Sequence, residues 1–587
     1  MTDEKFTDDF ISLSDVYLAY RKAKSEAFYD NLHPSALAYV NFEQNLQKNI
    51  ENLFCLLNRN VHSWNQDANF IGGYLYIPKS LDDSSWNNSN TAHFRSVDPN
   101  LDWKQRFIEN NNQRLEAKYR LIITPTVEYQ IVSALWIIKV GDKFEEKLDK
   151  DLSFGNRLRR SRPRSKDLES SSGPVNQDSP GLFLPYFAAY RNWRQNGLDA
   201  MRNLINDGKS VTAITMDLAS FYHNVSPNFL LKAAFLKAIN VTLDKNEIHL
   251  TRLLLSSIDY WYSRTPDFKE RPEGALPVGL SASKVISNVL LFELDQQIST
   301  GLNPKYYGRY VDDIFLVLET PVLNLSGSAI LEHLSKNVPC IKIDRQAGQA
   351  PGLRIKLNYA SNSDLRFAPS KQKIFSLSSD HGLDLVDQIS SQIRAQSSEY
   401  RMLPEVPRSS AEMAEKALLA SSDASLIADA LRKADVISIR RLGLSLLIRD
   451  IESYSSHLAR SEWSELRQEF YGLVHRHMVT PKGLFDLFSY YRKVFSLMVA
   501  NYDFPEANRF IDDLTSCFDL IKNTTTVEKG RTQRIELCKT YFEKILWQTA
   551  LQAAGAPKFD KWPQLRLLLK KCLIYQESTT QISESAP

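Results

Sequence analysis

The sequence GRYVDDIFLVL, residues 308–318, places two adjacent aspartates, Asp312 and Asp313, inside a run of aromatic and aliphatic residues. The flanks of the pair are typical of two strands that meet at a tight turn. A buried hairpin tip seldom carries two acids, because an unpaired buried carboxylate is energetically unfavourable. Metal binding removes that penalty. An exposed acidic turn is the alternative interpretation of this stretch taken alone.

A third carboxylate, Asp217, ends the strand-like run VTAITM at 211–216 and is followed by the aromatic pair Phe221 and Tyr222. Neighbouring strands of one sheet can bring Asp217 and Asp312 within reach of the same pair of metal ions. Two divalent cations about 3.5–4 Å apart activate an attacking hydroxyl and stabilise a leaving pyrophosphate. Cations of this kind prefer oxygen ligands. The acids therefore favour a two-metal site.

The stretch GALPVGLSASKVISNVLLFELD at 274–295 adds a third element, in which a turn at 277–279 leads into a helix. A glycine such as Gly279 lets the backbone approach a nucleotide closely. The predicted helix carries Ser283 and Asn288. An ordinary loop-to-helix start is the alternative for this stretch taken alone.

Together the three elements resemble the palm of a reverse transcriptase. Asp217 and its aromatic pair resemble the first catalytic motif of that family, LPVGLSASKVISN resembles LPQGxxxSxxxxN, and YVDD at 310–313 resembles the YxDD box. Val278 stands where the family usually has glutamine. The resemblance implies a nucleotidyltransferase that uses two Mg²⁺ ions, with Mn²⁺ as an alternative. The implied catalytic residues are Asp217, Asp312 and Asp313, and the implied metal ligands are Asp217, Leu218, Asp312 and Asp313.

The resemblance also implies residues that bind the incoming deoxynucleotide. RLIITP at 120–125 is similar to a fingers motif whose arginine grips the triphosphate through paired hydrogen bonds. FAPSKQKIF at 367–375 is similar to a motif whose lysine protonates the leaving pyrophosphate, and YIPK at 76–79 contributes a weaker candidate, Lys79. A bulky aromatic at 222 resembles the steric gate against a ribose 2′-hydroxyl. The expected nucleotide-binding residues are Arg120, Tyr222, Gly279, Ser283 and Lys371. Surface charges, and core packing for the aromatics, are the alternatives.

A basic stretch, RLRRSRPRSK at 157–166, contains no acidic residue. Neutralisation of phosphates dominates nucleic-acid binding, so this stretch is a candidate path for a strand. A solvated basic loop is the alternative. The candidate nucleic-acid-binding residues are Arg157, Arg159, Arg160, Arg162 and Arg164.

The resemblance implies an α+β fold, a right-hand polymerase with fingers and palm, and the change in composition along the chain predicts that an all-α domain follows it. Glycine and proline become sparse after about residue 385, where amphipathic helical patterns dominate. Such helices favour stacking of HEAT-like type and self-association. The expected regions are 1–70, N-terminal helices; 71–205, fingers; 206–384, palm; 385–575, helical domain; and 576–587, disordered tail.

Composition excludes several classes of protein. Of the 587 residues 43% are hydrophobic and 24% charged, which is typical of a globular protein. The net charge of +3 argues against a uniformly cationic nucleic-acid-binding protein. The five scattered cysteines support neither a disulfide framework nor a zinc ribbon. An acidic N-terminus and the lack of a long apolar run favour a protein of the bacterial cytoplasm without membrane partners.

Residues of about 70–380 resemble the bacterial abortive-infection and defence-associated reverse transcriptases, the AbiK-like and unknown groups, and the helical C-terminal third resembles theirs by length and class alone. The retron signature VTG is absent. The resemblance implies defence against phage, deoxynucleotide substrates, and untemplated synthesis of DNA that is primed by a tyrosine and stays covalently attached to it. A homo-oligomer is expected from the amphipathic C-terminal helices. Tyr17, Tyr20, Tyr29 and Tyr39 are candidate primers, with packing as the alternative for each. A template-copying enzyme with a dedicated noncoding RNA, and a phage-sensing assembly protein with dispensable polymerisation, remain alternatives.

Overall fold

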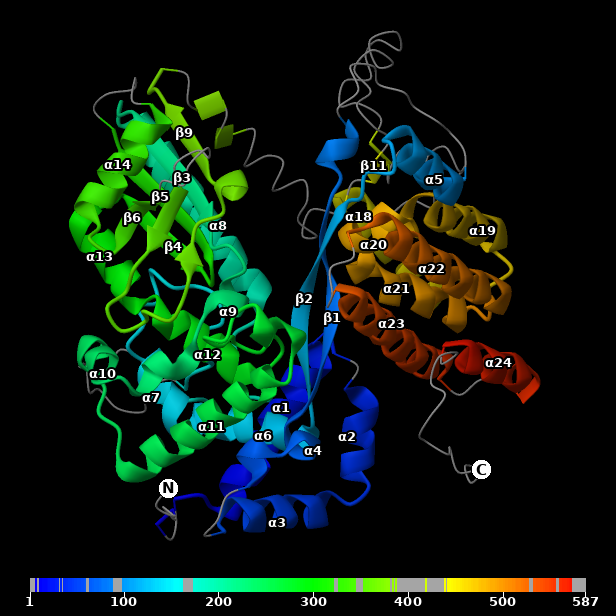
Figure 1. Ribbon diagram of the computed structural model, residues 1–587, viewed down its shortest axis with the longest axis horizontal. Helices are drawn as coiled ribbons and strands as arrows, with labels where there is room; N and C mark the ends of the chain where they lie inside the picture. The colour runs from blue at the N-terminus through cyan, green and yellow to red at the C-terminus, as the bar shows by residue number, and fades with distance from the viewer. Residues whose placement is uncertain are drawn as a thin grey trace. The chain divides into compact units, whose positions relative to one another are not determined.

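The structure is a computed structural model, and it describes most of the chain (Figure 1). The residues outside the description are 1–5, 8–9, 31, 34, 60–62, 88–97, 162–172, 321–325, 345–351, 381–382, 385, 388–417, 420–437, 440, 527–530, 556–558 and 573–587. Helices and strands are mixed in the first two thirds of the chain, and helices dominate the last third. The expected α+β class with a helical C-terminal region is confirmed at this level.

The chain forms two compact units, residues 1–74 with 122–395 and residues 75–121 with 396–587. This division differs from the regions expected from composition, because part of the expected fingers segment belongs with the helical C-terminal region. The strands β1 (Gly72–Asp82) and β2 (Glu116–Pro125) pair in a two-stranded sheet, and each passes from one unit into the other. The expected function of each region stays a prediction.

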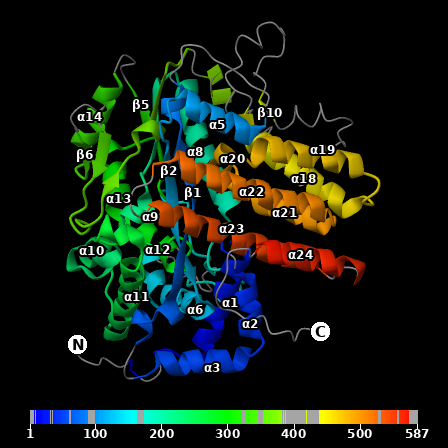
Figure 2. The ribbon, with the colours of Figure 1, turned by 45° about the vertical axis from the view of Figure 1, so that its right-hand side comes forward.

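A four-stranded antiparallel sheet forms the centre of the first unit, with strand order β4-β5-β3-β9 (Figures 1 and 2). Its strands are β3 (Val211–Asp217), β4 (Tyr306–Tyr310), β5 (Asp313–Glu319) and β9 (Lys373–Leu377). The expected strand before Asp217 and the expected hairpin at 308–318 are both confirmed. A second antiparallel sheet contains β6 (Ile341–Asp344), β7 (Gly352–Ile355) and β8 (Leu365–Arg366).

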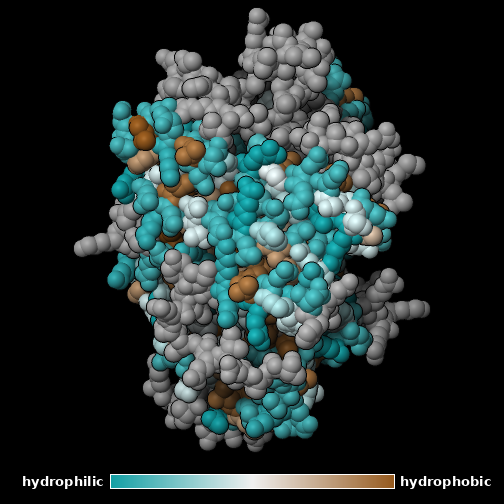
Figure 3. All heavy atoms as spheres, turned by 90° about the vertical axis from the view of Figure 1, so that its right-hand side faces the viewer, coloured by the Kyte–Doolittle hydropathy of each residue, from teal (hydrophilic) through white to brown (hydrophobic). Residues whose placement is uncertain are grey.

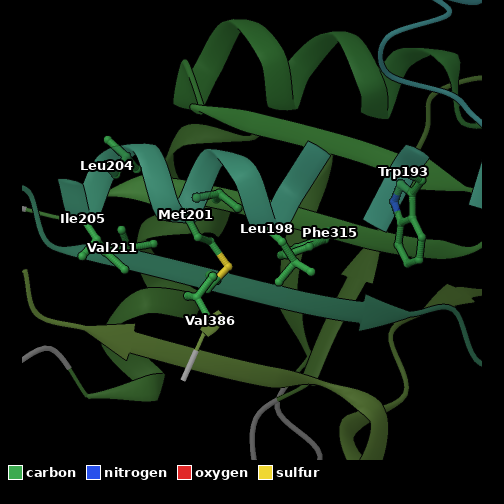
Figure 4. Packing of buried hydrophobic residues seen from close by; sticks show 10 residues of the cluster. Trp193, Leu198, Met201, Leu204, Ile205, Val211, Phe315 and Val386 are labelled. Carbon is green, nitrogen blue, oxygen red and sulfur yellow. The ribbon is translucent and has the colours of Figure 1, made fainter. Parts of the chain in front are cut away.

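Helix α8 (Tyr186–Asn206) packs across the central sheet through one apolar face (Figure 4). Trp193, Leu198 and Met201 of this helix are buried with Phe315 of β5. Gly197 permits the close approach, because a Cβ there would lie 2.2 Å from the Phe315 ring. The helix is therefore held at a fixed position against the strands that flank Asp312 and Asp313.

Further helices complete the first unit, and one of them, α6, begins at Val127, two residues after Pro125. Their bounds are α1 Leu13–Tyr29, α2 Ala36–Glu43, α3 Leu46–Leu57, α4 Ala68–Ile71, α6 Val127–Trp136, α7 Asp142–Glu145, α9 Phe221–Asn224, α10 Ala233–Ile239, α11 Lys245–Ser263, α12 Ser281–Leu290, α13 Phe292–Leu302 and α14 Gly327–Asn337.

The second unit is mainly helical. Its elements are α5 Pro99–Glu109, β10 Leu418–Leu419, β11 Ser438–Ile439, α18 Arg441–His457, α19 Ser464–Leu473, α20 Pro481–Asp486, α21 Phe488–Ala500, α22 Phe504–Thr524, α23 Arg531–Ala554 and α24 Trp562–Cys572. Trp103 Nε1 donates to Thr524 Oγ1 at 3.0 Å, and the Leu115 amide donates to the Thr524 carbonyl at 3.0 Å. These bonds and a buried cluster of Trp86, Trp103, Leu115 and Leu520 attach residues 75–121 to α22.

The molecular face seen in Figure 3 is largely hydrophilic, with hydrophobic atoms in small separate areas. Among the described residues, no helix combines the length and the apolar character that a membrane span requires.

Candidate active site

The three acidic residues expected to be catalytic lie together at one end of the central sheet. Asp217 is the last residue of β3, and it pairs directly with Asp313, the first residue of β5. Directly opposed residues of an antiparallel pair have Cα atoms about 4.5–5.5 Å apart. Asp312 lies in the two-residue turn between β4 and β5. Two segments distant in sequence thus bring three carboxylates to one place.

The carboxylates are only partly balanced by positive charge. Burial, followed by the charges of Asp312 and Asp217, raises the pKa of Asp313 to about 7. Lys371 opposes this rise, and its Nζ donates to Asp217 Oδ2 at 2.8 Å. The lysine, whose side chain is 62% exposed, thus supplies one positive charge to a cluster of three acids.

This donor set fits hard divalent cations. Carboxylate oxygens are the ligands that Mg²⁺ prefers, and a cluster of unbalanced acids gains most from a bound cation. The side chain of Leu218 is a hydrocarbon without a donor atom, so only the main-chain carbonyl of this residue could serve as a ligand. No three His, Cys, Asp or Glu side chains within the described ranges already converge in a ligand arrangement. Mg²⁺ usually takes several of its ligands from water and substrate phosphates, which a site with few protein ligands permits.

The turn that carries Asp312 has a strained backbone. Val311 has a φ of 60°, in the left-handed region that β-branched residues rarely adopt. Its carbonyl accepts a hydrogen bond of 2.8 Å from Arg309 Nη1. A Cβ on Gly155 would lie 2.8 Å from Val311 Cγ2, so only glycine fits beside the turn. The surroundings therefore hold the turn in a conformation that valine alone disfavours.

Arg309 is fully buried directly behind the turn, and sequence analysis missed it. Its Nε and Nη2 donate to the two carboxylate oxygens of Asp295 at 2.9 and 2.7 Å. Tyr307 also donates to Asp295, at 2.6 Å. An arginine between Gly308 and Tyr310 in an otherwise apolar strand was the available signal, because a buried arginine needs a partner. Nothing local in the sequence identifies Asp295 as that partner.

Asn288 joins this network to the segment beside the turn. Its Oδ1 accepts from Arg309 Nη1 at 3.0 Å, and its Nδ2 donates to the Gly155 carbonyl at 2.6 Å. The side chain is fully buried. Asn288 is therefore a positioning residue for the turn, which gives a structural reason for its place in the motif-like stretch.

Tyr222 is half-buried on α9, close to the start of the 274–295 stretch. Ser287 Oγ donates to its hydroxyl at 3.2 Å, and its carbonyl accepts from the Leu276 amide at 2.8 Å. Ser283, by contrast, is fully buried, and its Oγ has no hydrogen-bond partner among the described residues. This buried position differs from the expected contact between Ser283 and a nucleotide, because Ser283 lies on the side of α12 that faces the core.

Gly279 adopts a φ of +107°, which explains why a glycine stands there. A Cβ at this position would lie 2.1 Å from Cε1 of His33, so an imidazole fills the side on which nucleotide approach was expected. His33 Nδ1 lies 2.5 Å from Asp30 Oδ2, and His33 Nε2 has no partner in the described part of the chain. Burial by itself raises the pKa of Asp30, but the contact with His33 outweighs burial, and the pKa is lowered. No sequence signal identified this pair.

Arg120 and Lys79 are exposed side chains of the second unit, on β2 and β1. Their expected contacts with a triphosphate stay predictions.

The arginines at the start of the basic stretch are engaged within the fold. Arg157 Nε lies 2.5 Å from Glu145 Oε1, and Arg160 Nη2 lies 2.6 Å from Glu145 Oε2. Arg159 Nε donates to the Phe183 carbonyl at 2.7 Å. Glu145 is fully buried, so its carboxylate requires these cations. This differs from the expected row of arginines open to nucleic acid. Arg162 and Arg164 lie outside the described residues.

Two sequence comparisons found reverse transcriptases to which this chain is similar. Residues 108–341 match the family model described as reverse transcriptase (RNA-dependent DNA polymerase). The chain is also 31% identical over 138 residues to the Retron Ec83 reverse transcriptase of Escherichia coli. That similarity covers 22% of this chain and 41% of the retron protein, so the chain spans less than half the length of this relative. The matched segment includes Asp217, Asp312 and Asp313, and the family's description is that of an RNA-dependent DNA polymerase.

Proposed function

We propose that this chain is a DNA polymerase of the reverse-transcriptase type that acts in bacterial defence against phage. The observation that carries the polymerase assignment is the direct pairing of Asp217 with Asp313, with Asp312 in the adjoining turn. These acids lie within the segment that matches the reverse transcriptase family. Defence is supported by the resemblance of residues of about 70–380 to defence-associated enzymes, and by the likeness to a retron reverse transcriptase.

In this proposal, Asp217, Asp312, Asp313 and the Leu218 carbonyl would hold two Mg²⁺ or Mn²⁺ ions. Bound cations of this kind neutralise charge that develops on the attacking and leaving oxygens during phosphoryl transfer. The chain's own residues orient the substrates. Lys371 gives up its contact with Asp217 to protonate the leaving pyrophosphate, and Tyr222 excludes a ribose 2′-hydroxyl.

The polymerase proposal is tested by Asp312→Ala combined with Asp313→Ala. Purified protein with Mg²⁺ and deoxynucleoside triphosphates should build DNA, and the double variant should lose this activity by at least about 10³-fold. Glu319→Ala is a matched control, since this half-exposed acid lies on the same strand, β5. Normal synthesis by the double variant would reject the site.

We further propose untemplated synthesis primed by a tyrosine of the chain, as in the AbiK-like group. Among the candidate primers, Tyr29 is 72% exposed, whereas Tyr20 and Tyr39 are buried. Exposure therefore favours Tyr29. Denaturing electrophoresis should show a mass shift that deoxyribonuclease removes, and Tyr29→Phe should abolish it while Tyr20→Phe should not. A shift that survives in Tyr29→Phe would move the assignment to another tyrosine.

The likeness to a retron reverse transcriptase supports a second candidate, a template-copying enzyme with a dedicated noncoding RNA. Sequencing of the DNA product separates the two. A unique sequence complementary to a co-purified RNA supports copying, and homopolymeric or random product supports untemplated synthesis. The HEAT-like stacking of the helical region, its self-association and a phage-sensing role that dispenses with polymerisation remain proposals. Protection of cells by the Asp312/Asp313 double variant would favour the last of these.

A further inference from the structure

An exposed group of aromatic rings begins helix α8. Tyr186, Phe187 and Tyr190 are 75%, 64% and 38% exposed, and we call them the aromatic platform. The rings of Tyr186 and Phe187 meet edge to face with centroids 6.3 Å apart. Large exposed rings cost free energy in water unless something covers them. Their position therefore calls for a binding partner.

The platform is continuous with the catalytic turn. The ring of Tyr190 contacts Tyr310 edge to face at 5.1 Å, and the Tyr310 hydroxyl lies 3.5 Å from the Tyr186 carbonyl. Tyr310 precedes Val311 and Asp312 in the turn. A nucleic-acid strand whose end lies at Asp312 would therefore pass close to the platform.

The platform is also fixed in place relative to the acids. Trp193, one turn further along α8, donates from Nε1 to the Gly308 carbonyl at 2.9 Å. Its own carbonyl accepts from the Tyr306 hydroxyl at 2.6 Å. A Cβ on Gly308 would lie 2.2 Å from the Tyr306 hydroxyl oxygen, so the packing leaves little freedom. The platform and the catalytic turn thus belong to one rigid assembly of α8 and β4.

Positive charge accompanies the rings. Arg194 lies 5.6 Å from the centroid of the Tyr190 ring, and Arg191 is exposed on the same helix. The first turn of α8 has no acidic residue, and its first acid is Asp199. Rings interleaved with guanidinium groups match the stacked bases and phosphates of a single strand.

We propose that the aromatic platform binds single-stranded nucleic acid, the part of the primer or product strand that adjoins the catalytic acids. Tyr186 and Phe187 stack with bases, and Arg191 and Arg194 neutralise phosphates. Stacking suits any sequence, because every base presents a π face. This inference rests on the proposed polymerase function, since it assigns the strand on which that site acts. The charge and the continuity with Tyr310 favour a nucleic acid over a second copy of the chain.

The test measures binding rather than synthesis. Fluorescence anisotropy with a labelled oligothymidylate, in the Asp312→Ala/Asp313→Ala background, reports affinity without extension of the strand. Tyr186→Ser combined with Phe187→Ser should weaken binding by about tenfold or more, from the lost base stacking. Phe28→Ser is the matched control, because this ring is 80% exposed in the same unit and lies on α1. The control should bind as the background protein does.

Further measurements distinguish a nucleic acid from a second copy of the chain as the partner of the platform. Arg194→Gln should reduce the slope of log affinity against log salt by about 1, as for one lost phosphate contact. Unchanged oligonucleotide affinity in the double serine variant would overturn the proposal. Dissociation of an oligomer by that variant, seen by analytical ultracentrifugation without loss of oligonucleotide affinity, would assign the platform to a contact between copies. Because the background is catalytically inactive, failure of the polymerase proposal leaves this result interpretable.

Discussion

Two groups of charged side chains meet at the β4–β5 hairpin, and they differ in how completely their charges are matched. In front, Asp217, Asp312 and Asp313 share one lysine, and the pKa of Asp313 rises to about 7. Behind, the fully buried Arg309 makes a two-point ion pair with Asp295. The matched pair holds the turn in position, and the acids in front, where burial and like charge raise the pKa of Asp313, are suited to a bound cation. The degree of charge balance therefore distinguishes the two groups.

The largest expected effect concerns the matched pair. Arg309→Met should destabilise the first unit by about 3–5 kcal/mol, because it leaves Asp295 buried without its cation. Urea unfolding measures the loss. Lys209→Met is the control, since Lys209 and Glu319 form a pair with 42% exposure on each side. Such a pair contributes about 0–1 kcal/mol. Equal losses in the two variants would contradict the comparison.

A second prediction concerns the basic stretch. Arg157→Met should cost about 1.5–3 kcal/mol, the range for hydrogen bonds to a charged group, because buried Glu145 loses one of its two cations. It should leave the salt dependence of oligonucleotide binding unchanged. Arg191→Met, at an exposed arginine, should show the reverse pattern. A reduced salt slope in Arg157→Met with unchanged stability would restore the nucleic-acid role first expected for this arginine.

The third prediction uses pH. The pKa of Asp313 is about 7 in the folded chain and 3.8 ordinarily. Between these two pH values the folded state holds a proton on Asp313 that the unfolded chain has released. Without metal, stability should therefore fall as pH rises from about 4 to 7, and Asp313→Asn should remove this fall. Bound Mg²⁺ competes with the proton, so its affinity should rise about tenfold per pH unit below about 7.

Thermal unfolding with a chelator, and calorimetric Mg²⁺ titration at several pH values, measure these two effects. Asp312→Asn serves as a comparison, because removing its charge should move the midpoint to lower pH. If the stability of the unsubstituted protein did not change with pH, this would contradict the raised pKa of Asp313.

The smallest expected effect is that of Lys371→Gln. Loss of the contact with Asp217 removes the one cation that opposes the rise in the pKa of Asp313, so that pKa should move upward. Nucleotide incorporation should fall by about tenfold or less if Lys371 assists pyrophosphate release. Steady-state kinetics from about pH 6 to about pH 9 separates the effect on the pKa of Asp313 from the effect on pyrophosphate release. Lys373→Gln on β9 is the control. Equal rates in both variants would assign Lys371 to charge balance alone.

Local sequence predicted those parts of the site that depend on neighbours along the chain. The strand before Asp217, the hairpin around YVDD and the helix after Gly279 all follow from residue order, and each is present. The surroundings of Ser283 and Arg157 could not be predicted from local sequence, because burial and pairing decide what their side chains contact. Their partners, or the lack of them, come from segments far apart in sequence.

Residue types and their order along the chain determined the strand and the hairpin that carry the three acids, and the helical character of the last third. Tertiary structure alone decided that Arg309 and Asp295 support the turn, that His33 fills the space beside Gly279, and that residues 75–121 belong with the C-terminal helices. The physical reason is that propensity and turn chemistry act between near neighbours. Burial of a charge, by contrast, is settled by whichever distant group reaches it.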